Sequence, residues 1–195
     1  PFRSNLKIIG NKIITSDQNN VLYILDKSNG EMIKSIPTEE TVLKNNFVNS
    51  ISTNQNTFFY LNTFGSLYSI NNDNSINWFI NLNQSLEENA NIVFYSNPLI
   101  SHNNKIIISS SPFLYIVDSN NGSTIYKKAI SSIEKPIVSK NNLFLITKDN
   151  YLVCIDLLKG EIIYSIDISD KIANFLDTKK KDIIIKTFAI INNKL

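Results

Sequence analysis

Oxygen-bearing side chains alternate in two short polar stretches of the sequence, a pattern typical of a calcium-binding loop. The stretches are DKSNGE at residues 26–31 and DSNNGS at residues 118–123. A calcium loop of the EF-hand type closes on its ion with a bidentate glutamate at its twelfth position. Pro37 and Ala129 stand at that position here. Neither stretch is therefore predicted to hold calcium, and the recurrence of the pattern needs another explanation.

The residue types that carry nucleophilic and zinc chemistry occur only once each. Cys154 is the single cysteine and His102, in SHNNK, is the single histidine, so no disulfide or cysteine–histidine zinc cage can form within the chain. Cys154 stands where Ile24, Ser69 and Ile116 stand in similar stretches, and it is predicted to be a small buried hydrophobic residue. His102 is predicted to be a surface residue in a turn. With no glycine-rich phosphate loop either, no catalytic, cofactor-binding or metal-binding residue is predicted.

The composition indicates an ordinary globular protein. Hydrophobic residues make up 43% of the 195 residues, charged residues make up 18%, and the formal net charge is +2. A nucleic-acid-binding face needs clustered basic residues, so nucleic acid is not expected as a partner. No apolar run reaches the roughly 18 residues that a membrane-spanning helix requires. We expect one domain over residues 1–195 and no transmembrane span.

The polar stretches belong to a repeat. LYILDKSNGEMI, LYSINNDNSINW, LYIVDSNNGSTIY and LVCIDLLKGEIIY share one pattern, which places Asp26, Asn71, Asp118 and Asp156 in register. The copies follow one another at intervals of about 40 residues, a spacing typical of propeller blades. What looked like a calcium loop is therefore interpreted as a recurring structural turn.

Each copy predicts four strands. A short apolar segment leads through an Asn-rich turn to a second apolar segment, then to the LYILD-like strand, the tight turn and a final strand. The turns are too short for crossover helices, so antiparallel meanders are expected. Several strands are apolar on both faces, which favours sheets packed on both sides. The predicted blades are 4–46, 47–96, 97–135 and 136–170, with a partial blade at 171–195.

The turn after each LYILD-like strand has a physical explanation. The Asp or Asn side chain can accept hydrogen bonds from backbone N–H groups two or three residues later, and a glycine supplies the positive φ that closes the hairpin. The glycines are Gly30, Gly122 and Gly160, and Asn74 takes that place in the second copy. Four residues after this position stand Lys34, Trp78, Tyr126 and Tyr164. The three aromatic residues are predicted to pack one blade against another.

Two polar insertions interrupt the repeats, at residues 37–46 and 83–91. The second contains SLEE, residues 85–88, which has the form of a capping box that could begin a helical turn. Both are expected to be loops, where binding residues often lie.

The LYILD-like strand, the turn glycine and the aromatic residue four positions later resemble the repeat of the pyrroloquinoline-quinone-like (PQQ-like) β-propeller family. Within that family the chain is most similar to the bacterial outer-membrane barrel-assembly factors of the BamB type. The resemblance implies an all-β fold of about four and a half blades from a larger, eight-bladed propeller. It also implies a periplasmic, outer-membrane-associated lipoprotein with no cofactor, which acts as a scaffold and not as an enzyme.

The same resemblance implies a partner and a contact site. The partner would be a barrel-assembly outer-membrane protein, bound through its periplasmic domains. The opening PFRSNLKII is similar to a family loop that carries an arginine with apolar neighbours, so Phe2 and Arg3 are expected to contact the partner, with Arg3 as a bidentate donor to a carboxylate. In the alternative interpretation, Arg3 is simply an exposed terminal residue.

Two other functions share this fold. A PQQ-dependent quinoprotein dehydrogenase would need a calcium ion held by carboxylates and amide oxygens, a tryptophan over the quinone and an aspartate base; Trp78 is the only tryptophan and stands at the predicted packing position. A luminal or extracellular sensor propeller would need none of these. Isolated blades would also expose unpaired edges, so we expect this chain to aggregate or dimerise unless further blades are supplied.

Overall fold

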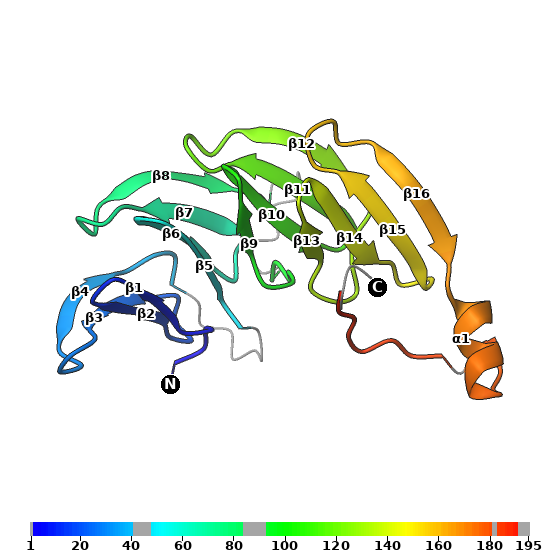
Figure 1. Ribbon diagram of the computed structural model, residues 1–195. Coiled ribbons are helices and arrows are strands. Elements are labelled where there is room, and N and C mark those ends of the chain that lie inside the picture. Colours follow the sequence, from blue (N-terminus) through cyan, green and yellow to red (C-terminus); the bar gives the residue numbers. More distant parts are fainter. Residues whose placement is uncertain (1, 41–47, 84–92, 181–182, 191–195) are drawn as a thin grey trace. The chain divides into compact units, whose positions relative to one another are not determined.

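The computed structural model describes residues 2–40, 48–83, 93–180 and 183–190. Within them lie sixteen β-strands and one α-helix (Figure 1). In chain order the strands are β1 (Lys7–Ile9), β2 (Lys12–Ser16), β3 (Leu22–Asp26), β4 (Met32–Ile36), β5 (Ser50–Asn54), β6 (Thr57–Leu61), β7 (Ser66–Ile70), β8 (Ile76–Asn81), β9 (Ile100–His102), β10 (Lys105–Ser110), β11 (Phe113–Asp118), β12 (Thr124–Lys128), β13 (Ile137–Ser139), β14 (Asn142–Ile146), β15 (Tyr151–Asp156) and β16 (Ile162–Asp167).

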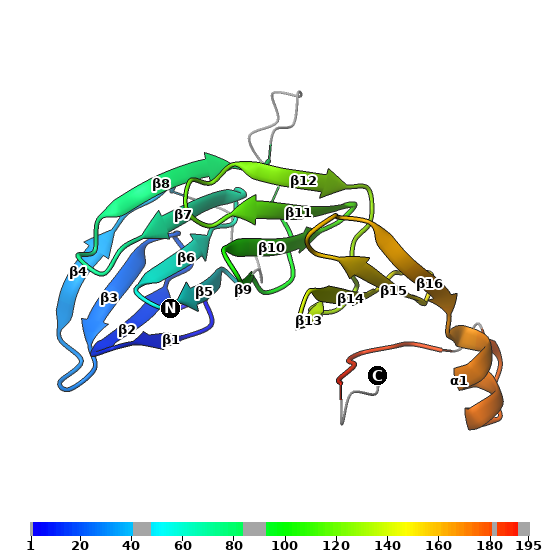
Figure 2. The same ribbon diagram turned by 45° about the horizontal axis from the view of Figure 1, so that its top comes forward.

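The strands form four sheets of four strands each. Every sheet is an antiparallel meander in which neighbours in sequence are neighbours in space: β1–β4, β5–β8, β9–β12 and β13–β16 (Figures 1 and 2). Short turns allow only this connection between strands. The predicted all-β fold with four-stranded antiparallel blades is confirmed. We refer to the four sheets in chain order as blades 1 to 4.

The repeated features include a shared irregularity in the hydrogen-bond register between strands. The last two strands of blades 1, 2 and 4 shift register at equivalent places, between Ile24 and Leu25, between Ser69 and Ile70, and between Cys154 and Ile155. Such a bulge adds local twist and redirects the strand just before its hairpin turn. The recurring sequence thus specifies the bulge as well as the turn.

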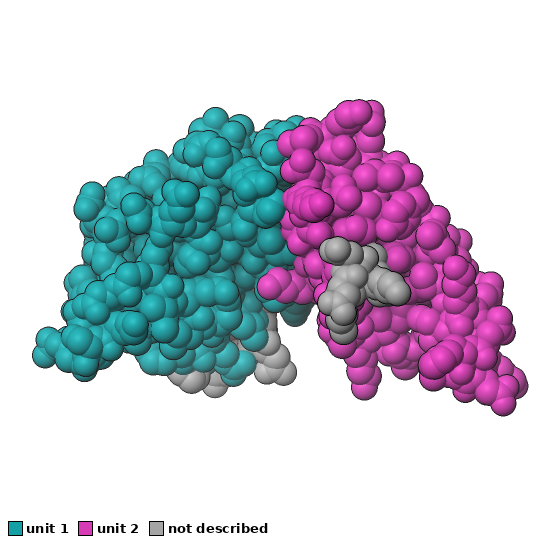
Figure 3. All heavy atoms as spheres, in the orientation of Figure 1, with its two compact units in different colours: residues 1–108, 116–125 teal, residues 109–115, 126–195 magenta. Residues whose placement is uncertain are grey.

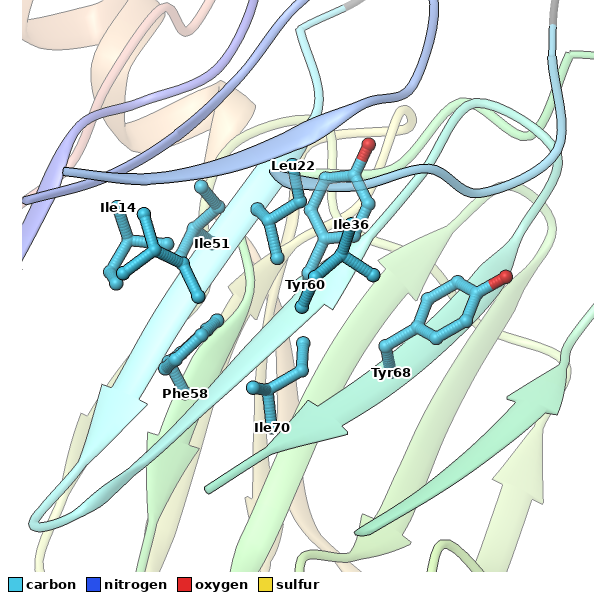
Figure 4. Packing of buried hydrophobic residues seen from close by; sticks show 9 residues of the cluster. Ile14, Leu22, Ile36, Ile51, Phe58, Tyr60, Tyr68 and Ile70 are labelled. Atoms are coloured by element: carbon cyan, nitrogen blue, oxygen red, sulfur yellow. The ribbon is translucent and has the colours of Figure 1, made fainter. Parts of the chain in front are cut away.

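The middle strands of blades 2 and 3 are buried on both faces, as their apolar runs predicted. All five residues of β7 are buried, whereas β4 is exposed except at Ile36. One core lies between blades 1 and 2 (Figure 4), and its residues are Ile14, Leu22, Ile24, Ile36, Ile51, Phe58, Tyr60, Tyr68 and Ile70. Each fully buried side chain of this size contributes about 1.5–3 kcal/mol relative to an exposed one.

The chain divides into two compact units, shown in Figure 3. The first comprises residues 1–108 and 116–125, and the second comprises residues 109–115 and 126–195. Blades 1 and 2 lie wholly in the first unit and blade 4 wholly in the second, while the division passes through blade 3.

The expected partial blade at residues 171–195 does not form in the described part of that range. Helix α1 (Ser169–Leu176) follows β16 instead, and residues 177–180 and 183–190 contain no strand. A strand needs a hydrogen-bonded neighbour, whereas a helix satisfies its own backbone groups. Asp170 lies in the first turn, where its charge complements the helix dipole, and Asp177 ends the helix in the left-handed conformation.

The predicted loop at residues 37–46 is described only as far as residue 40, and these four residues form no strand. The predicted capping box SLEE, residues 85–88, lies outside the described residues.

Candidate protein-binding site

The N-terminal segment is fixed by backbone pairing to blades 1 and 2. Phe2 forms an antiparallel bridge with Asp17, and Ser4 forms a parallel bridge with Asn49. Between them, the N–H of Arg3 donates to the carbonyl of Ser16 at 2.8 Å and its carbonyl accepts from the N–H of Asn49, also at 2.8 Å. The backbone of Arg3 is therefore held on both sides, and its side chain projects from a fixed position.

The side chain of Asn5 extends this attachment. Its amide nitrogen donates to the carbonyl of Ile51 at 2.9 Å and its amide oxygen accepts from the N–H of Ile51 at 2.8 Å. An asparagine that pairs in this way replaces one rung of a β-ladder. Residues 2–5 are thus anchored to the edge of blade 2, but they do not form one of its strands.

Large apolar side chains are exposed around Arg3. Phe2 is 60% exposed, Leu6 is 57% exposed and Val48 is 55% exposed. We call Phe2, Arg3, Leu6 and Val48 the N-terminal patch. Arg3 itself is half-buried, and within the described ranges no ion pair joins it to another residue. Exposed apolar groups close in the chain to an arginine that forms no ion pair with another described residue are typical of the anchors of protein interfaces.

Phe2 is partly ordered by an aromatic contact. Its ring meets the ring of Tyr23 edge to face, with centroids 5.6 Å apart. The Tyr23 hydroxyl donates to Asp17 at 3.1 Å. Burial and the neighbouring Asp17 carboxylate raise the pKa of Tyr23, so this hydroxyl stays protonated as a donor. The N-terminal patch therefore contains a preorganised aromatic contact, which reduces the conformational entropy lost on binding.

The buried side-chain amide of Asn49 supports the N-terminal segment. The Asn49 side-chain nitrogen lies within hydrogen-bond distance of four acceptors: Ser16 Oγ at 3.0 Å, the Tyr60 hydroxyl at 3.0 Å, Asn20 Oδ1 at 3.2 Å and the carbonyl of Asp17 at 3.2 Å. Two donor hydrogens shared among these acceptors fix the side chain in one orientation. Because the N–H of the same residue holds Arg3, this network sets the position of the patch.

Asn20 links this network to the following loop. It is buried with a positive φ of 66°, a conformation that asparagine tolerates better than most residues. Its amide nitrogen donates to Thr63 Oγ1 at 2.8 Å and to the carbonyl of Glu39 at 3.0 Å.

The carboxylate of Glu39 accepts three hydrogen bonds from side chains of blade 2. It accepts from Ser66 Oγ at 2.5 Å, from Asn62 Nδ2 at 2.6 Å and from the Tyr68 hydroxyl at 2.9 Å. Burial alone would raise the pKa of the Glu39 carboxyl, but these hydrogen bonds outweigh burial and the pKa lies below its ordinary value. A charged carboxylate with three donors ties the loop after β4 to blade 2.

The recurring turns use their polar atoms internally. Asp26 Oδ1 accepts from the N–H of Ser28, Asp118 Oδ1 from that of Asn120 and Asp156 Oδ1 from that of Leu158, each at 2.7 Å. In blade 2, Asn71 Oδ1 accepts from the N–H groups of Asp73 and Ser75 at 3.0 Å. Hydrogen bonds from the side chain and the N–H of Ser28 lower the pKa of Asp26. These oxygens cap turns and do not form an ion-binding cage.

The turn glycines have a second role, because an aromatic residue of the preceding blade covers them. Gly122 and Gly160 are buried, with φ of 78° and 73°. Trp78 of blade 2 lies over Gly122 of blade 3, and Tyr126 of blade 3 lies over Gly160 of blade 4. In blade 1 a lysine stands at the aromatic position. Lys34 Nζ donates to the carbonyl of Asn74 in the turn of blade 2 at 2.8 Å. Tyr164 is exposed, and its hydroxyl is hydrogen-bonded to Cys154.

Cys154 is buried, as its place in the repeat predicted. Burial raises the pKa of its thiol, although the Tyr164 hydrogen bond lowers it in part. His102 ends strand β9 and is half-buried, so its predicted location in a turn is wrong; its Nε2 lies 3.0 Å from Asn103 Nδ2. No group of three or more His, Cys, Asp or Glu residues that could hold a metal occurs in the ranges that the structure describes.

Comparison with known proteins agrees with this repeat geometry. Residues 83–165 match the family model described as outer membrane protein assembly factor BamB, a model of PQQ-like repeats. The repeats within residues 83–165 are thus of the PQQ-like type. No curated protein matches the chain in sequence. The PQQ-like signature is thus carried by the turns, glycines and aromatic residues described above.

Solved structures show the same fold at low sequence identity. BamB from Moraxella catarrhalis is 16% identical with a TM-score of 0.64, over 83% of this chain and 50% of its own. Quinohemoprotein alcohol dehydrogenase from Comamonas testosteroni is 9% identical with a TM-score of 0.67, over 86% of this chain and 35% of its own. The computationally designed protein Ika8 is 12% identical with a TM-score of 0.65, over 83% of this chain and 48% of its own. The chain thus spans about half the length of the BamB structure, or less of the others, and these matches show the fold alone.

The only tryptophan of the chain is engaged in packing between blades 2 and 3. Trp78, the only tryptophan, packs on Gly122 and donates from Nε1 to the carbonyl of Ser119 at 3.2 Å, so its ring is not available to cover a quinone.

Several residues of this region were not predicted from the sequence. Asn49 and Glu39 lie between strands, and nothing in the sequence indicated their contacts. Asn20 stands in register with Gly65 and Asn150, which share its positive φ, so its turn could have been inferred from that register. Lys34 did stand at the aromatic position of the repeat, and its contact with Asn74 could have been inferred from that register.

No helix among the described residues is long and apolar enough to cross a membrane.

Proposed function

We propose that this chain is a non-catalytic protein-binding scaffold of the bacterial cell envelope, located in the periplasm at the outer membrane. The observation that carries the proposal is the match of residues 83–165 to the BamB family model. The proposed partner is a barrel-assembly outer-membrane protein, bound through its periplasmic domains.

The N-terminal patch is the proposed contact. Phe2, Leu6 and Val48 offer exposed apolar surface, and the Arg3 guanidinium can donate two parallel hydrogen bonds to one carboxylate. The backbone bonds of Arg3 to Ser16 and Asn49 fix the point from which the side chain extends. A rigid arginine flanked by apolar anchors is the usual composition of an interface hot spot.

The test is co-purification of the chain with the periplasmic domains of the barrel-assembly protein from the same organism. Arg3→Ala and Arg3→Glu are expected to weaken binding at least about tenfold, with the charge reversal stronger, because a partner carboxylate would then face a like charge. Lys27→Glu is the matched control, since it makes the same charge change on an exposed hairpin of the same unit. Binding of Arg3→Glu equal to that of the wild type would refute the contact assignment.

The absence of catalysis is tested separately. The purified chain, supplied with PQQ and calcium, is expected not to reduce an artificial electron acceptor in the presence of alcohols. Turnover above that of the heat-denatured chain would overturn the scaffold proposal.

A further inference from the structure

An aromatic residue recurs in the segment that leads into a blade. Phe2, Phe47 and Tyr95 each stand ten residues before the first residue of the second strand of a blade, which is β2, β6 or β10. Ser132 takes this place in blade 4. Phe47 lies outside the described residues, while Phe2 is 60% exposed and Tyr95 is 63% exposed. The N-terminal patch includes only the first of these aromatic residues.

The backbone around Tyr95 is fixed to blade 2. The preceding residue, Phe94, is buried, and its ring covers Gly65, where an added Cβ would stand 2.9 Å from Phe94 Cγ. At the other end of the segment, Leu99 is buried and its N–H donates to Ser50 Oγ at 2.7 Å. Tyr95 lies between blade 2 and strand β9 in the middle of the chain, so its exposure does not arise from a chain end. Its ring is presented to solvent from an ordered backbone, which lowers the entropic cost of binding.

A continuous path of hydrogen bonds joins this segment to the N-terminal patch. The N–H of Phe94 donates to the carbonyl of Thr63 at 2.8 Å, and Thr63 Oγ1 accepts from Asn20 Nδ2 at 2.8 Å. Asn20 Oδ1 in turn accepts from Asn49 Nδ2 at 3.2 Å, and the N–H of Asn49 donates to the carbonyl of Arg3 at 2.8 Å. All of these residues lie in the first compact unit. The two exposed aromatic residues are therefore set on one hydrogen-bonded framework.

We infer that the protein partner of the N-terminal patch also contacts Tyr95, so that its binding surface extends from blade 1 to blade 3; this inference rests on the proposed function. Exposed aromatic residues on an ordered backbone are typical anchors of protein interfaces. A membrane surface is not the proposed occupant. Arg3 is the only charged residue in segments 2–6, 48–49 and 93–99, whereas attraction to an anionic membrane needs clustered Lys and Arg.

The experiment is calorimetric titration of the full chain with the periplasmic domains of the barrel-assembly protein. Tyr95→Ala is expected to weaken binding about tenfold, because it removes an interface anchor. Tyr95→Phe should bind like the wild type, since phenylalanine stands at this position in the first two copies of the repeat. The matched control is Phe175→Ala, which removes a ring that is 87% exposed on helix α1 in the second unit and should leave the affinity unchanged. All three variants should unfold at the urea concentration of the wild type, because the altered side chains are exposed.

The double variant Phe2→Ala/Tyr95→Ala tests whether one partner uses both anchors. Its affinity should fall by the product of the two single effects, on the order of a hundredfold, because separate anchors usually contribute independently. A double variant that binds no more weakly than Phe2→Ala alone would overturn the inference.

The outcomes separate this inference from the proposed function. Binding that Arg3→Glu weakens and Tyr95→Ala leaves unchanged would overturn the inference and leave the N-terminal contact in place. A wild type that does not bind the partner at all would refute the proposed function and the inference with it. Binding to vesicles of phosphatidylethanolamine and phosphatidylglycerol that is lost in Tyr95→Ala, with partner affinity unchanged, would overturn the inference in favour of a membrane surface.

Discussion

The indole ring of Trp78 lies so close over Gly122 that a Cβ added at residue 122 would stand 2.7 Å from Trp78 Cε3. The glycine therefore provides the positive φ of its own hairpin and the space for an aromatic ring from the preceding blade. Tyr126 stands in the same relation to Gly160, with the nearest distance 3.1 Å. A turn first considered as a calcium loop is thus a joint between blades.

Gly122→Ala should destabilise the fold strongly. The change adds the cost of a positive φ to a clash with the indole ring, for a total of about 3 kcal/mol in the free energy of unfolding. Gly10→Ala, which has a φ of 56° and open space around the added Cβ, isolates the backbone term and should cost about 1 kcal/mol. Urea unfolding followed by the fluorescence of Trp78 measures both variants. Equal losses would show that the ring does not constrain residue 122.

The buried side-chain amide of Asn49 should contribute more to the free energy of unfolding than an exposed side-chain amide does. Asn49→Leu removes the donor shared by Ser16, Tyr60 and Asn20, and the unsatisfied buried groups should lower the free energy of unfolding by about 2–3 kcal/mol. The control is Asn141→Leu in an exposed turn, with an expected change within about 0.5 kcal/mol. Chemical denaturation of both variants tests the difference. A loss no larger than that of the control would contradict the network.

The parts of the fold that follow from local chemistry could be predicted from the sequence. Asp26 and Gly30 recur in register with Asp118 and Gly122, and each pair specifies the same turn wherever it occurs. The aromatic joints followed from the same register, since one position held Trp78, Tyr126 and Tyr164.

The parts that depend on non-repeated contacts could not be predicted. The network around Asn49 joins residues far apart in sequence, and nothing in a single asparagine indicates that it is buried. The partial blade at residues 171–195 was predicted as a continuation of the repeat, but a strand forms only where a neighbouring strand accepts its hydrogen bonds. Helix α1 formed in the first part of this range because it needs no such neighbour.

Glu39 should make stability depend on pH. Its folded-state pKa is lowered, so its contribution is complete above the ordinary value of 4.5 and is lost as the pH falls through the folded-state pKa. Glu39→Gln should cost about 0.5–1 kcal/mol at neutral pH, because an uncharged amide accepts more weakly from Ser66, Asn62 and Tyr68, while solvent screens the exposed part of this carboxylate. The difference between wild type and variant should shrink in acid. Urea unfolding as a function of pH measures it, with the exposed neighbour Glu40→Gln as control; a difference that does not change with pH would contradict the role of the charge.

Cys154 should react with a thiol reagent only after local or global opening. The thiol is buried and its pKa is raised by burial, so native-state modification should be about a hundredfold or more slower than in urea. An exposed thiol, introduced as Asn29→Cys in a Cys154→Ala background, supplies the unprotected rate. Equal rates for the two native proteins would show that β15 is not packed as described.

The central claim is that the N-terminal patch, and not the recurring turns, carries the function. Hydrogen–deuterium exchange with and without the periplasmic domains of the barrel-assembly protein tests this claim most directly, because it locates the contact on the chain. Exchange at residues 2–6 and 48–51 is expected to be slower in the complex, and exchange at residues 26–31 and 118–123 is expected to be unchanged. Protection confined to the turns, or no protection anywhere at saturating partner, would contradict it.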